Sequence, residues 1–509
     1  MRTGKALRNI FSQAINLILI SLLNFVYRAV LVNSIGIEYV GLNATLLNIV
    51  ALLSLTELGV SQSVSYFLYK PLKDRNLVKI KIILDFLKKT YIIIGLLNII
   101  ISIVLAIFIG DIINIDSIAT KNDLIMYFIL YAASGFIPYF FSYKRILIIA
   151  DQRNYEILPR ITIIKACDVF FKILLLLYLK SYFLVLVSQV IFVIIENLYI
   201  NRYISKRYEY IFIIKSDDEI SKNDKTDILT KIKSMFFHKL GDLSLNSTDN
   251  IIINHFSGLT LLGLFSNYVM ISGLITTFIS VLFNSITSSV GNLIADRNRG
   301  NVFSFFVFVY KISTFLFVYS AVSFYFISDS IIKIWLGNIY FIDDNIKILM
   351  SISLILLGMR VPLNMIKMAS GEVERDKYSP LIQALINLIL SVYLASKYGI
   401  VGVLLGTIIS NVVVPMWVQP YIVYTYVLKK NNFEYIYLIV RVVVLSLLNY
   451  FIFKILYLYL YERILGLSLD SFSDFIYLVF IVIIPSALVV ITFYFNKSDL
   501  IYIKRRIVL

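Results

Sequence analysis

The chain has 509 residues, of which 59% are hydrophobic and 15% aromatic, and its mean hydropathy is +0.85. These values exclude an ordinary soluble enzyme of this length and are typical of a membrane protein that crosses the bilayer many times. The formal net charge of +16 is compatible with a nucleic-acid partner. However, most of the cations lie in short loops between apolar segments, so we expect no nucleic-acid binding.

Apolar segments long enough to cross a membrane recur along the whole chain. A hydrocarbon core about 30 Å thick needs roughly 20 apolar residues in helical form. We predict fourteen transmembrane helices, whose weakest divisions are at Ser181 and Tyr398. They cover residues 9–33, 40–69, 84–113, 122–150, 159–180, 181–203, 235–256, 259–295, 302–328, 345–370, 380–397, 399–428, 434–461 and 473–495.

The loops between these helices are alternately basic and nearly free of cations. Most of the 47 Lys and Arg residues lie in or beside the loops of one side, which includes both termini. Cations are retained on the cytoplasmic side of a membrane. We therefore expect both termini and the most polar stretch, residues 204–234, to be cytoplasmic.

An internal repeat predicts how the helices are grouped. The glycine spacing of residues 36–42 returns in residues 258–264, at an offset of 222, and Pro159 and Pro380 open two helices at almost the same offset. Because the repeat spans an even number of helices, six, the two halves are parallel. We expect an all-α membrane protein of about 14 helices, with two parallel six-helix lobes around a central cavity plus two C-terminal helices. The expected parts are residues 1–203 (first lobe), 204–234 (cytoplasmic linker), 235–428 (second lobe) and 429–509 (two additional helices and a cytoplasmic tail).

Motifs for covalent chemistry are missing from the sequence. There is no Gly-rich phosphate loop followed by Lys and no paired-His metal motif, and the only histidines are His238 and His255. We therefore expect no enzymatic activity, no cofactor and no metal centre.

Charged side chains inside the predicted helices are the strongest functional signal, because each costs several kcal/mol at the bilayer centre unless it faces water or a partner. Lys165, Asp168 and Lys172 share one helical face, so Asp168 either pairs with one of the two lysines or lines a cavity with them. Cations outnumber anions at depth, which suits a phosphate-bearing ligand. The expected ligand-binding cations are Arg28, Lys165, Lys172, Lys311 and Arg360. The acidic residues expected to couple an ion or to form ion pairs are Glu57, Asp168, Asp242 and Asp249.

Between residues 34 and 91 the order of short motifs resembles the polysaccharide repeat-unit flippases. These form the Wzx-type branch of the multidrug/oligosaccharidyl-lipid/polysaccharide exporter superfamily. The motifs are GIEYVGLN at 36–43, LSLTELG at 53–59 and YKPL at 69–72, with Arg28 before them and Tyr91 after them. Beyond residue 100 the resemblance lies in the architecture.

The resemblance implies two lobes around a central cavity that opens alternately to the two faces of a bacterial cytoplasmic membrane. The cargo it implies is an undecaprenyl-diphosphate-linked oligosaccharide, moved from the cytoplasmic to the outer leaflet for capsule, exopolysaccharide or O-antigen synthesis. The implied partners are the lipid bilayer, a polysaccharide polymerase and other assembly proteins. Arg28 and Glu57 lie inside the matching region, so the resemblance supports a functional role for both.

Two related functions stay open. A lipid-linked peptidoglycan-precursor flippase has the same diphosphate to carry. A drug or cation antiporter of the same superfamily has the same architecture, but we expect its cavity to be acidic rather than cationic. A membrane-embedded glycosyltransferase or polymerase would need a large outer loop or an evident carboxylate site, and the longest predicted outer loop, residues 329–344, is short.

Overall fold

The computed structural model describes residues 2–57, 60–113, 119–214, 225–230, 232, 236, 247–295, 299–372, 374–458, 474 and 477–494. All regular secondary structure in these ranges is helical. The chain forms two compact units, Met1–Gly263 (unit 1) and Leu264–Leu509 (unit 2). The predicted all-α membrane fold is confirmed.

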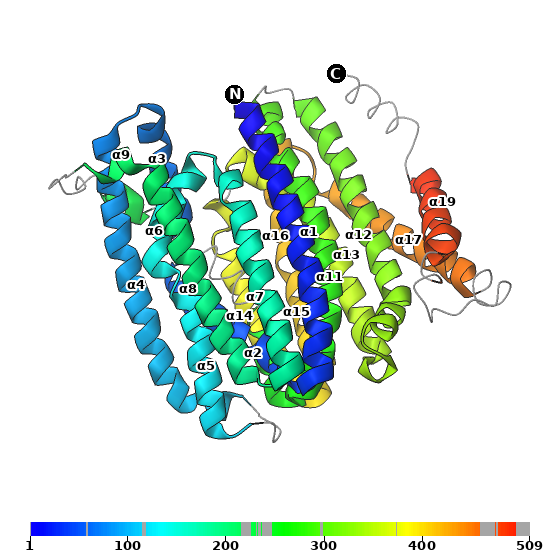
Figure 1. The fold of residues 1–509 in the computed structure, drawn as a ribbon. Helices are drawn as coiled ribbons and strands as arrows, with labels where there is room; N and C mark the ends of the chain where they lie inside the picture. Colours follow the sequence, from blue (N-terminus) through cyan, green and yellow to red (C-terminus); the bar gives the residue numbers. More distant parts are fainter. Residues whose placement is uncertain are drawn as a thin grey trace. The chain divides into compact units, whose positions relative to one another are not determined.

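Unit 1 is a bundle of long helices joined by short turns (Figure 1). The helix α1 packs along α7, and α4 packs against α5 and α6. Local capping sets several helix starts: the Thr120 side chain accepts from the Asp123 amide at 3.2 Å, and the Asn76 side chain accepts from the Lys79 amide at 2.9 Å. The elements are α1 (Arg2–Ile35), α2 (Glu38–Leu53), η1 (Ser54–Glu57), α3 (Val60–Lys73), α4 (Leu77–Ile112), α5 (Lys121–Phe136), α6 (Tyr139–Ala150), η2 (Asn154–Glu156), α7 (Leu158–Leu179), α8 (Tyr182–Arg207), α9 (Glu209–Phe212) and the start of α11 (Asp249–Ala295).

Two predicted transmembrane segments of unit 1 are broken helices. The segment 122–150 forms α5 and α6, which meet at Pro138, a residue that has no N–H to continue a helix. The segment 40–69 forms α2 and α3, separated by η1. The Ser54 hydroxyl donates to the Ala51 carbonyl at 2.6 Å, a contact that bends helices. Glu57 therefore lies at a break, and its expected position in the middle of a continuous helix is wrong.

The glycines that begin the two repeats make equivalent turns. Gly36 has φ of 110° and Gly258 has φ of 81°, a region that glycine adopts without strain. Gly258 divides α11 into two helices, at the division that the sequence predicts between residues 256 and 259. Glu38 and Thr260 each lie two residues after the glycine of their repeat, and the Thr260 hydroxyl donates to the Glu38 carboxylate at 3.3 Å.

The next glycines of the repeats form a close helix contact within unit 1. A Cβ atom on Gly41 would collide with the backbone carbonyl of Leu259, and a Cβ atom on Gly263 would collide with the backbone carbonyl of Ile37. These two contacts are equivalent, since residues 37 and 41 correspond to residues 259 and 263 at the offset of 222. The repeated segments therefore pack on each other symmetrically, at a distance that only glycine allows.

Unit 2 is a second helical bundle, with α12 packed on α13 and α14 packed on α15. Its core includes large aromatic side chains, among them Phe306, Tyr310, Phe317, Tyr424 and Tyr435. The elements that follow α11 are α12 (Arg299–Trp335), η3 (Asn338–Tyr340), α13 (Asp344–Ser370), η4 (Glu374–Asp376), α14 (Ser379–Tyr398), α15 (Ile400–Val413), α16 (Pro415–Ile422), η5 (Val423–Leu428), α17 (Phe433–Lys454), η7 (Val479–Ile483) and α19 (Ile484–Tyr494).

Both of the weakest predicted helix divisions are confirmed. Lys180 adopts a left-handed conformation after α7, and Ser181 caps α8 by accepting from the Leu184 amide at 3.4 Å. The helix α14 ends at Tyr398, directly before the start of α15. Pro159 and Pro380 each occupy the first turn of their helix, where proline is tolerated.

Ten helices of the described residues are long and apolar enough to cross a membrane, so the chain is a multi-pass membrane protein. The other predicted segments have separate explanations. The helix α2 and residues 480–492 are apolar but shorter, and α7 carries four charged residues. Most of residues 235–246 lie outside the described ranges. The number fourteen stays a prediction.

Candidate functional site

An ion pair and a chain of hydrogen bonds connect α7 to α8 and α5. The ammonium of Lys172 lies 2.7 Å from the Asp168 carboxylate and donates to Gln189 at 3.1 Å. Gln189 in turn donates to the Ser134 hydroxyl at 2.8 Å, and Ser188 donates to Asp168 at 3.5 Å. Lys172 is 8% exposed. The lysine is thus held inside unit 1 by a carboxylate and a neutral amide.

Lys165 is the remaining cation of the α7 stripe. It lies on the helical face that includes the buried residues Ile161 and Val169, yet its own side chain is exposed. The ion pair described above joins Asp168 to Lys172. With one carboxylate and two ammonium groups, this face of α7 carries a net positive charge.

Arg28 lies close to this stripe. It is half-buried on α1, which packs along α7, and it lies near Tyr27 and Tyr131. Tyr27 also lies near Asp168, and its ring centre is 5.9 Å from the Lys172 ammonium. The structure therefore brings Arg28, Asp168 and Lys172 together around one tyrosine.

A group of tyrosines that was not predicted from the sequence extends this region. The Tyr182 ring lies 5.0 Å from that of Tyr39 and 5.1 Å from that of Tyr127, measured between ring centres. The Tyr182 hydroxyl donates to the Asn43 side chain at 3.4 Å. Tyr39 and Asn43 belong to the GIEYVGLN motif, so their position in that motif was the available signal.

The Glu57 carboxylate is surrounded by hydroxyl groups. It accepts a hydrogen bond from Tyr91 at 2.8 Å and another from Ser61, and Tyr139 stacks on Tyr91 with 6.0 Å between ring centres. In the part of the chain that the structure describes, the partners of Glu57 are hydroxyls rather than cations.

The other two acidic candidates lie elsewhere. Asp249 is half-buried at the first residue of α11, and Asp242 lies outside the described residues. Among the residues that are described, no group of three or more His, Cys, Asp and Glu side chains could hold a metal ion.

The two cations expected in the second half lie at the same level of unit 2. Lys311 is 5% exposed on α12, and Arg360 on α13 donates to the Asn411 side chain on α15. The Ser313 hydroxyl donates to the Gly358 carbonyl at 2.7 Å and fixes the register of these antiparallel helices. Residue 311 is therefore level with residue 360.

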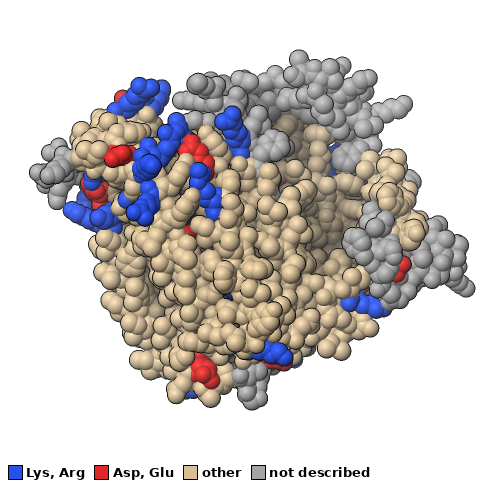
Figure 2. Space-filling view, viewed as in Figure 1, with Lys and Arg blue, Asp and Glu red and all other residues tan. Residues whose placement is uncertain are grey.

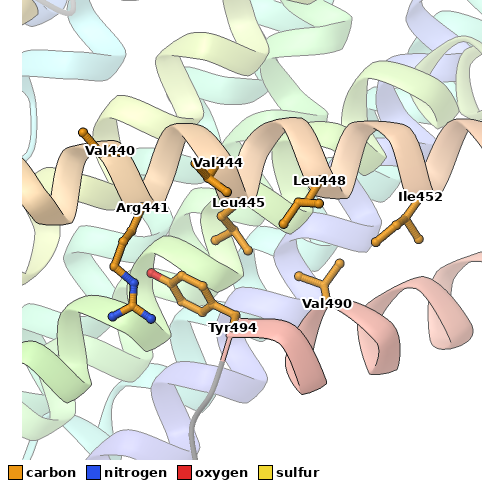
Figure 3. Close-up of a pocket in the computed structure, with 8 residues that line it drawn as sticks. All are labelled: Val440, Arg441, Val444, Leu445, Leu448, Ile452, Val490 and Tyr494. Carbon is orange, nitrogen blue, oxygen red and sulfur yellow. The ribbon is translucent and has the colours of Figure 1, made fainter.

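A groove between α17 and α19 has a cavity volume of about 170 Å³. In Figure 3, Arg441 and Tyr494 lie near each other at one end and aliphatic side chains occupy the rest. The Arg441 guanidinium is 5.5 Å from the Tyr494 ring centre, and the Tyr494 hydroxyl is 2.9 Å from the Thr314 hydroxyl. The groove suits an apolar chain and was not predicted. Its lining is Val440, Arg441, Val444, Leu445, Leu448, Ile452, Val490 and Tyr494.

Comparison with known proteins identifies the family. Residues 6–290 match the family described as "Polysaccharide biosynthesis protein". The chain belongs to this family. A search of curated proteins gives no match.

Three solved structures show the same fold as this polysaccharide biosynthesis protein. The lipid II flippase MurJ in an inward closed conformation is 15% identical, with a TM-score of 0.68 over 96% of this chain and 99% of that chain. An inward-facing multidrug resistance transporter of the MATE family and MOP superfamily is 13% identical, with a TM-score of 0.61 over 78% of this chain and 92% of that chain. A MOP superfamily transporter from Pyrococcus furiosus, described as having a binding pocket of reverse polarity, is 16% identical, with a TM-score of 0.53 over 84% and 96%.

These likenesses confirm the expected superfamily fold, whereas the Wzx-type branch stays a prediction. The family match includes Arg28, Glu57 and the α7 stripe. Lys311 and Arg360 lie beyond the matched residues. Their predicted role in ligand binding therefore rests only on their position within the helices of unit 2.

Proposed function

We propose that this polysaccharide biosynthesis protein moves undecaprenyl-diphosphate-linked oligosaccharide repeat units from the cytoplasmic to the outer leaflet of a bacterial cytoplasmic membrane. The products would be used for capsule, exopolysaccharide or O-antigen synthesis. The observation that supports the proposal most directly is the set of buried and half-buried cations on long helices of the two units: Arg28, Lys172, Lys311 and Arg360.

The physical problem is to move a glycan and a diphosphate through hydrocarbon, while the polyprenyl tail can stay in lipid. In unit 1, Arg28, Lys165 and Lys172 outnumber Asp168 by two charges. An Arg guanidinium binds phosphate oxygens through two parallel hydrogen bonds, and tyrosine rings and hydroxyls near Arg28 suit a sugar. Such a surface would lower the free-energy barrier to moving the polar head group across the membrane. The movement would proceed by alternating access and needs no covalent step.

Ion coupling belongs to the proposal as well. Glu57 accepts from two hydroxyls at a helix break, so it is a group that can bind a proton or a cation without breaking an ion pair. Asp249 and Asp242 are further candidates, and Asp168 takes part only if its pair with Lys172 opens.

The proposed orientation follows from the charge distribution of unit 1. Lys and Arg gather near the end of unit 1 where α9 lies (Figure 2). That end includes the α3–α4 turn with Lys70, Lys73 and Arg75 and the end of α8 with Lys206 and Arg207. Because cations are retained in the cytoplasm, we propose that this end of unit 1 is cytoplasmic. The alternation of basic and cation-poor loops along the sequence supports the same location for both termini.

Two alternative functions differ from the proposed one in the molecule that is transported. Fold similarity to the lipid II flippase MurJ favours a peptidoglycan precursor, which the same cations would suit. Fold similarity to a MATE transporter favours drug or cation antiport, but cations inside the helices would repel a cationic drug. The family match favours polysaccharide precursors.

Reconstituted transport distinguishes the three functions. Purified protein in proteoliposomes is given undecaprenyl-diphosphate-linked repeat units, lipid II or a cationic dye, and arrival in the opposite leaflet or lumen is measured. We expect movement of the repeat units, loss of that movement in Arg28→Ala, and normal movement in the control Arg202→Ala, whose side chain is exposed. Movement of lipid II alone, or of dye alone, would replace the proposal by the corresponding alternative.

A further inference from the structure

Three lysines gather on α4 and α6, away from the Arg28 group. The ammonium of Lys88 lies 6.0 Å from the centre of the Tyr143 ring, and that of Lys144 lies 5.7 Å from the same ring. Lys144 also interacts electrostatically with Lys88 and Lys81. Like charges repel, so an anion bound between these lysines would be attracted to them and would relieve the repulsion.

The protein itself supplies only part of the negative charge near these three lysines. Asp85 pairs with Lys81, 2.6 Å from its ammonium. Lys144 is held by neutral groups: it donates to the Ser205 hydroxyl at 2.6 Å, and its ammonium lies 4.8 Å from the Phe212 ring centre. Within the described residues, this group of three lysines and one aspartate has a net charge of about +2 at neutral pH.

The lysines lie at the edge of the apolar part of the bundle. From Tyr91 to Gly110, α4 has no charged residue, and these 20 residues span about 30 Å, the thickness of a hydrocarbon core. Lys88 lies three residues before the start of this stretch. Tyr91 stacks near Tyr139 of the antiparallel α6, so Lys144 lies at the same edge, at the depth of lipid headgroups.

Apolar surface continues from the lysines along α4. Leu96 is 51% exposed, Ile99 is 38% exposed and Ile103 is 58% exposed, and all three lie within about 80° of Lys88 around the helix axis. Tyr210 of α9 and Ile213 directly after it are 53% and 69% exposed, next to Phe212, whose ring lies near Lys144. A ligand that fits both surfaces has an anionic head and a long apolar tail.

We propose that Lys88 and Lys144 bind the phosphate of an anionic phospholipid headgroup, with the Ser205 hydroxyl and the Tyr143 ring positioning Lys144 and the acyl chains lying along α4. Lysine binds phosphate as a point charge, and basic residues beside a membrane attract anionic lipids. The apolar surface of α4 favours a lipid over free phosphate. This site is independent of the proposed transport function, because it uses other residues and needs no polyprenyl lipid.

The test measures lipid binding by the purified full-length protein. Nanodiscs of phosphatidylcholine are compared with nanodiscs containing phosphatidylglycerol, and the retained phosphatidylglycerol is counted by native mass spectrometry. The variant is Lys88→Gln with Lys144→Gln, and the matched control is Lys79→Gln with Lys206→Gln, which removes the same charge from two exposed lysines, one of them on the opposite side of α4. We expect the variant to bind phosphatidylglycerol at least tenfold more weakly, and the control to bind it like the wild type.

Three results would overturn the proposal. They are equal binding of phosphatidylglycerol by variant and wild type, an equal loss in the control pair, and competition by inorganic phosphate or glycerol phosphate as effective as competition by phosphatidylglycerol. If the double variant unfolds in phosphatidylcholine, Lys88→Gln alone replaces it. Lys88 is exposed, so this single change leaves the fold intact, and binding equal to wild type would count against the site.

Discussion

The ion pair inside unit 1 gives a prediction whose magnitude can be worked out. At 2.7 Å between Lys172 and Asp168, Coulomb attraction with an effective dielectric constant of about 20 is about 6 kcal/mol. Part of this attraction offsets the desolvation of the two charges. Lys172→Gln leaves the Asp168 carboxylate with Ser188 as its weak remaining partner at 3.5 Å. We expect this change to cost about 3–5 kcal/mol of stability.

The double variant Lys172→Gln with Asp168→Asn removes both charges and leaves two neutral groups that can bond each other. We expect it to recover all but about 1 kcal/mol, the value of an ordinary hydrogen bond. The assay is unfolding by sodium dodecyl sulfate in mixed micelles, where the single change should shift the equilibrium by a factor of roughly a hundred to a few thousand.

Lys165→Gln is the matched control for this experiment. It lies on the same helix but is exposed, so we expect a change within about 0.5 kcal/mol. A single Lys172→Gln variant as stable as wild type, or a double variant as unstable as the single one, would refute the reasoning. Transport by the same variants answers a second question: if Lys172 contacts the cargo, the double variant regains stability but not polymer export.

Three further predictions concern the site, the topology and a buried pair. Arg28→Ala should abolish polymer export with protein still in the membrane, whereas Arg28→Lys keeps part of it because lysine offers only a point charge; export by the alanine variant would make Arg28 structural. With the exposed Cys167 replaced, a cysteine placed within residues 204–234 should resist an impermeant reagent in intact cells, and labelling would reverse the topology. Asp376→Asn should destabilise unit 2 by about 3 kcal/mol, because Lys367 is 6% exposed and pairs with Asp376; adding Lys367→Met should restore the unfolding midpoint, and a persistent loss would show that the pair is not the cause.

Much of the fold is predictable because apolar length and glycine spacing act locally. The turns at Gly36 and Gly258 and the helix starts at Pro159 and Pro380 follow from backbone chemistry that the residue type imposes. The break at Glu57 was not predicted. Gly59 follows Glu57 by two residues, but a single glycine is common in transmembrane helices and does not by itself indicate a break. A serine hydroxyl that bonds back to the Ala51 carbonyl looks like any other serine in a sequence.

The candidate site was predictable in its charges but not in its partners. Helical spacing places Lys165, Asp168 and Lys172 on one face, but it does not select which lysine the carboxylate joins. That choice depends on Gln189 of α8, which binds Lys172, and the packing of α7 on α8 is a tertiary property. The tyrosines around Arg28 come from several helices, so no local sequence pattern predicts that they lie together.

The symmetric contact at Gly41 and Gly263 has a consequence for the origin of the chain. A contact in which one segment meets the carbonyl of its own copy, and the copy meets the carbonyl of the first, is the isologous interface of a homodimer. Here both copies are on one polypeptide. Fusion of two identical subunits would create this geometry at once, without new contacts, and would then free each half to diverge. The aspartates and lysines of one half could then change while Gly41 and Gly263 kept their contacts with the opposite segment.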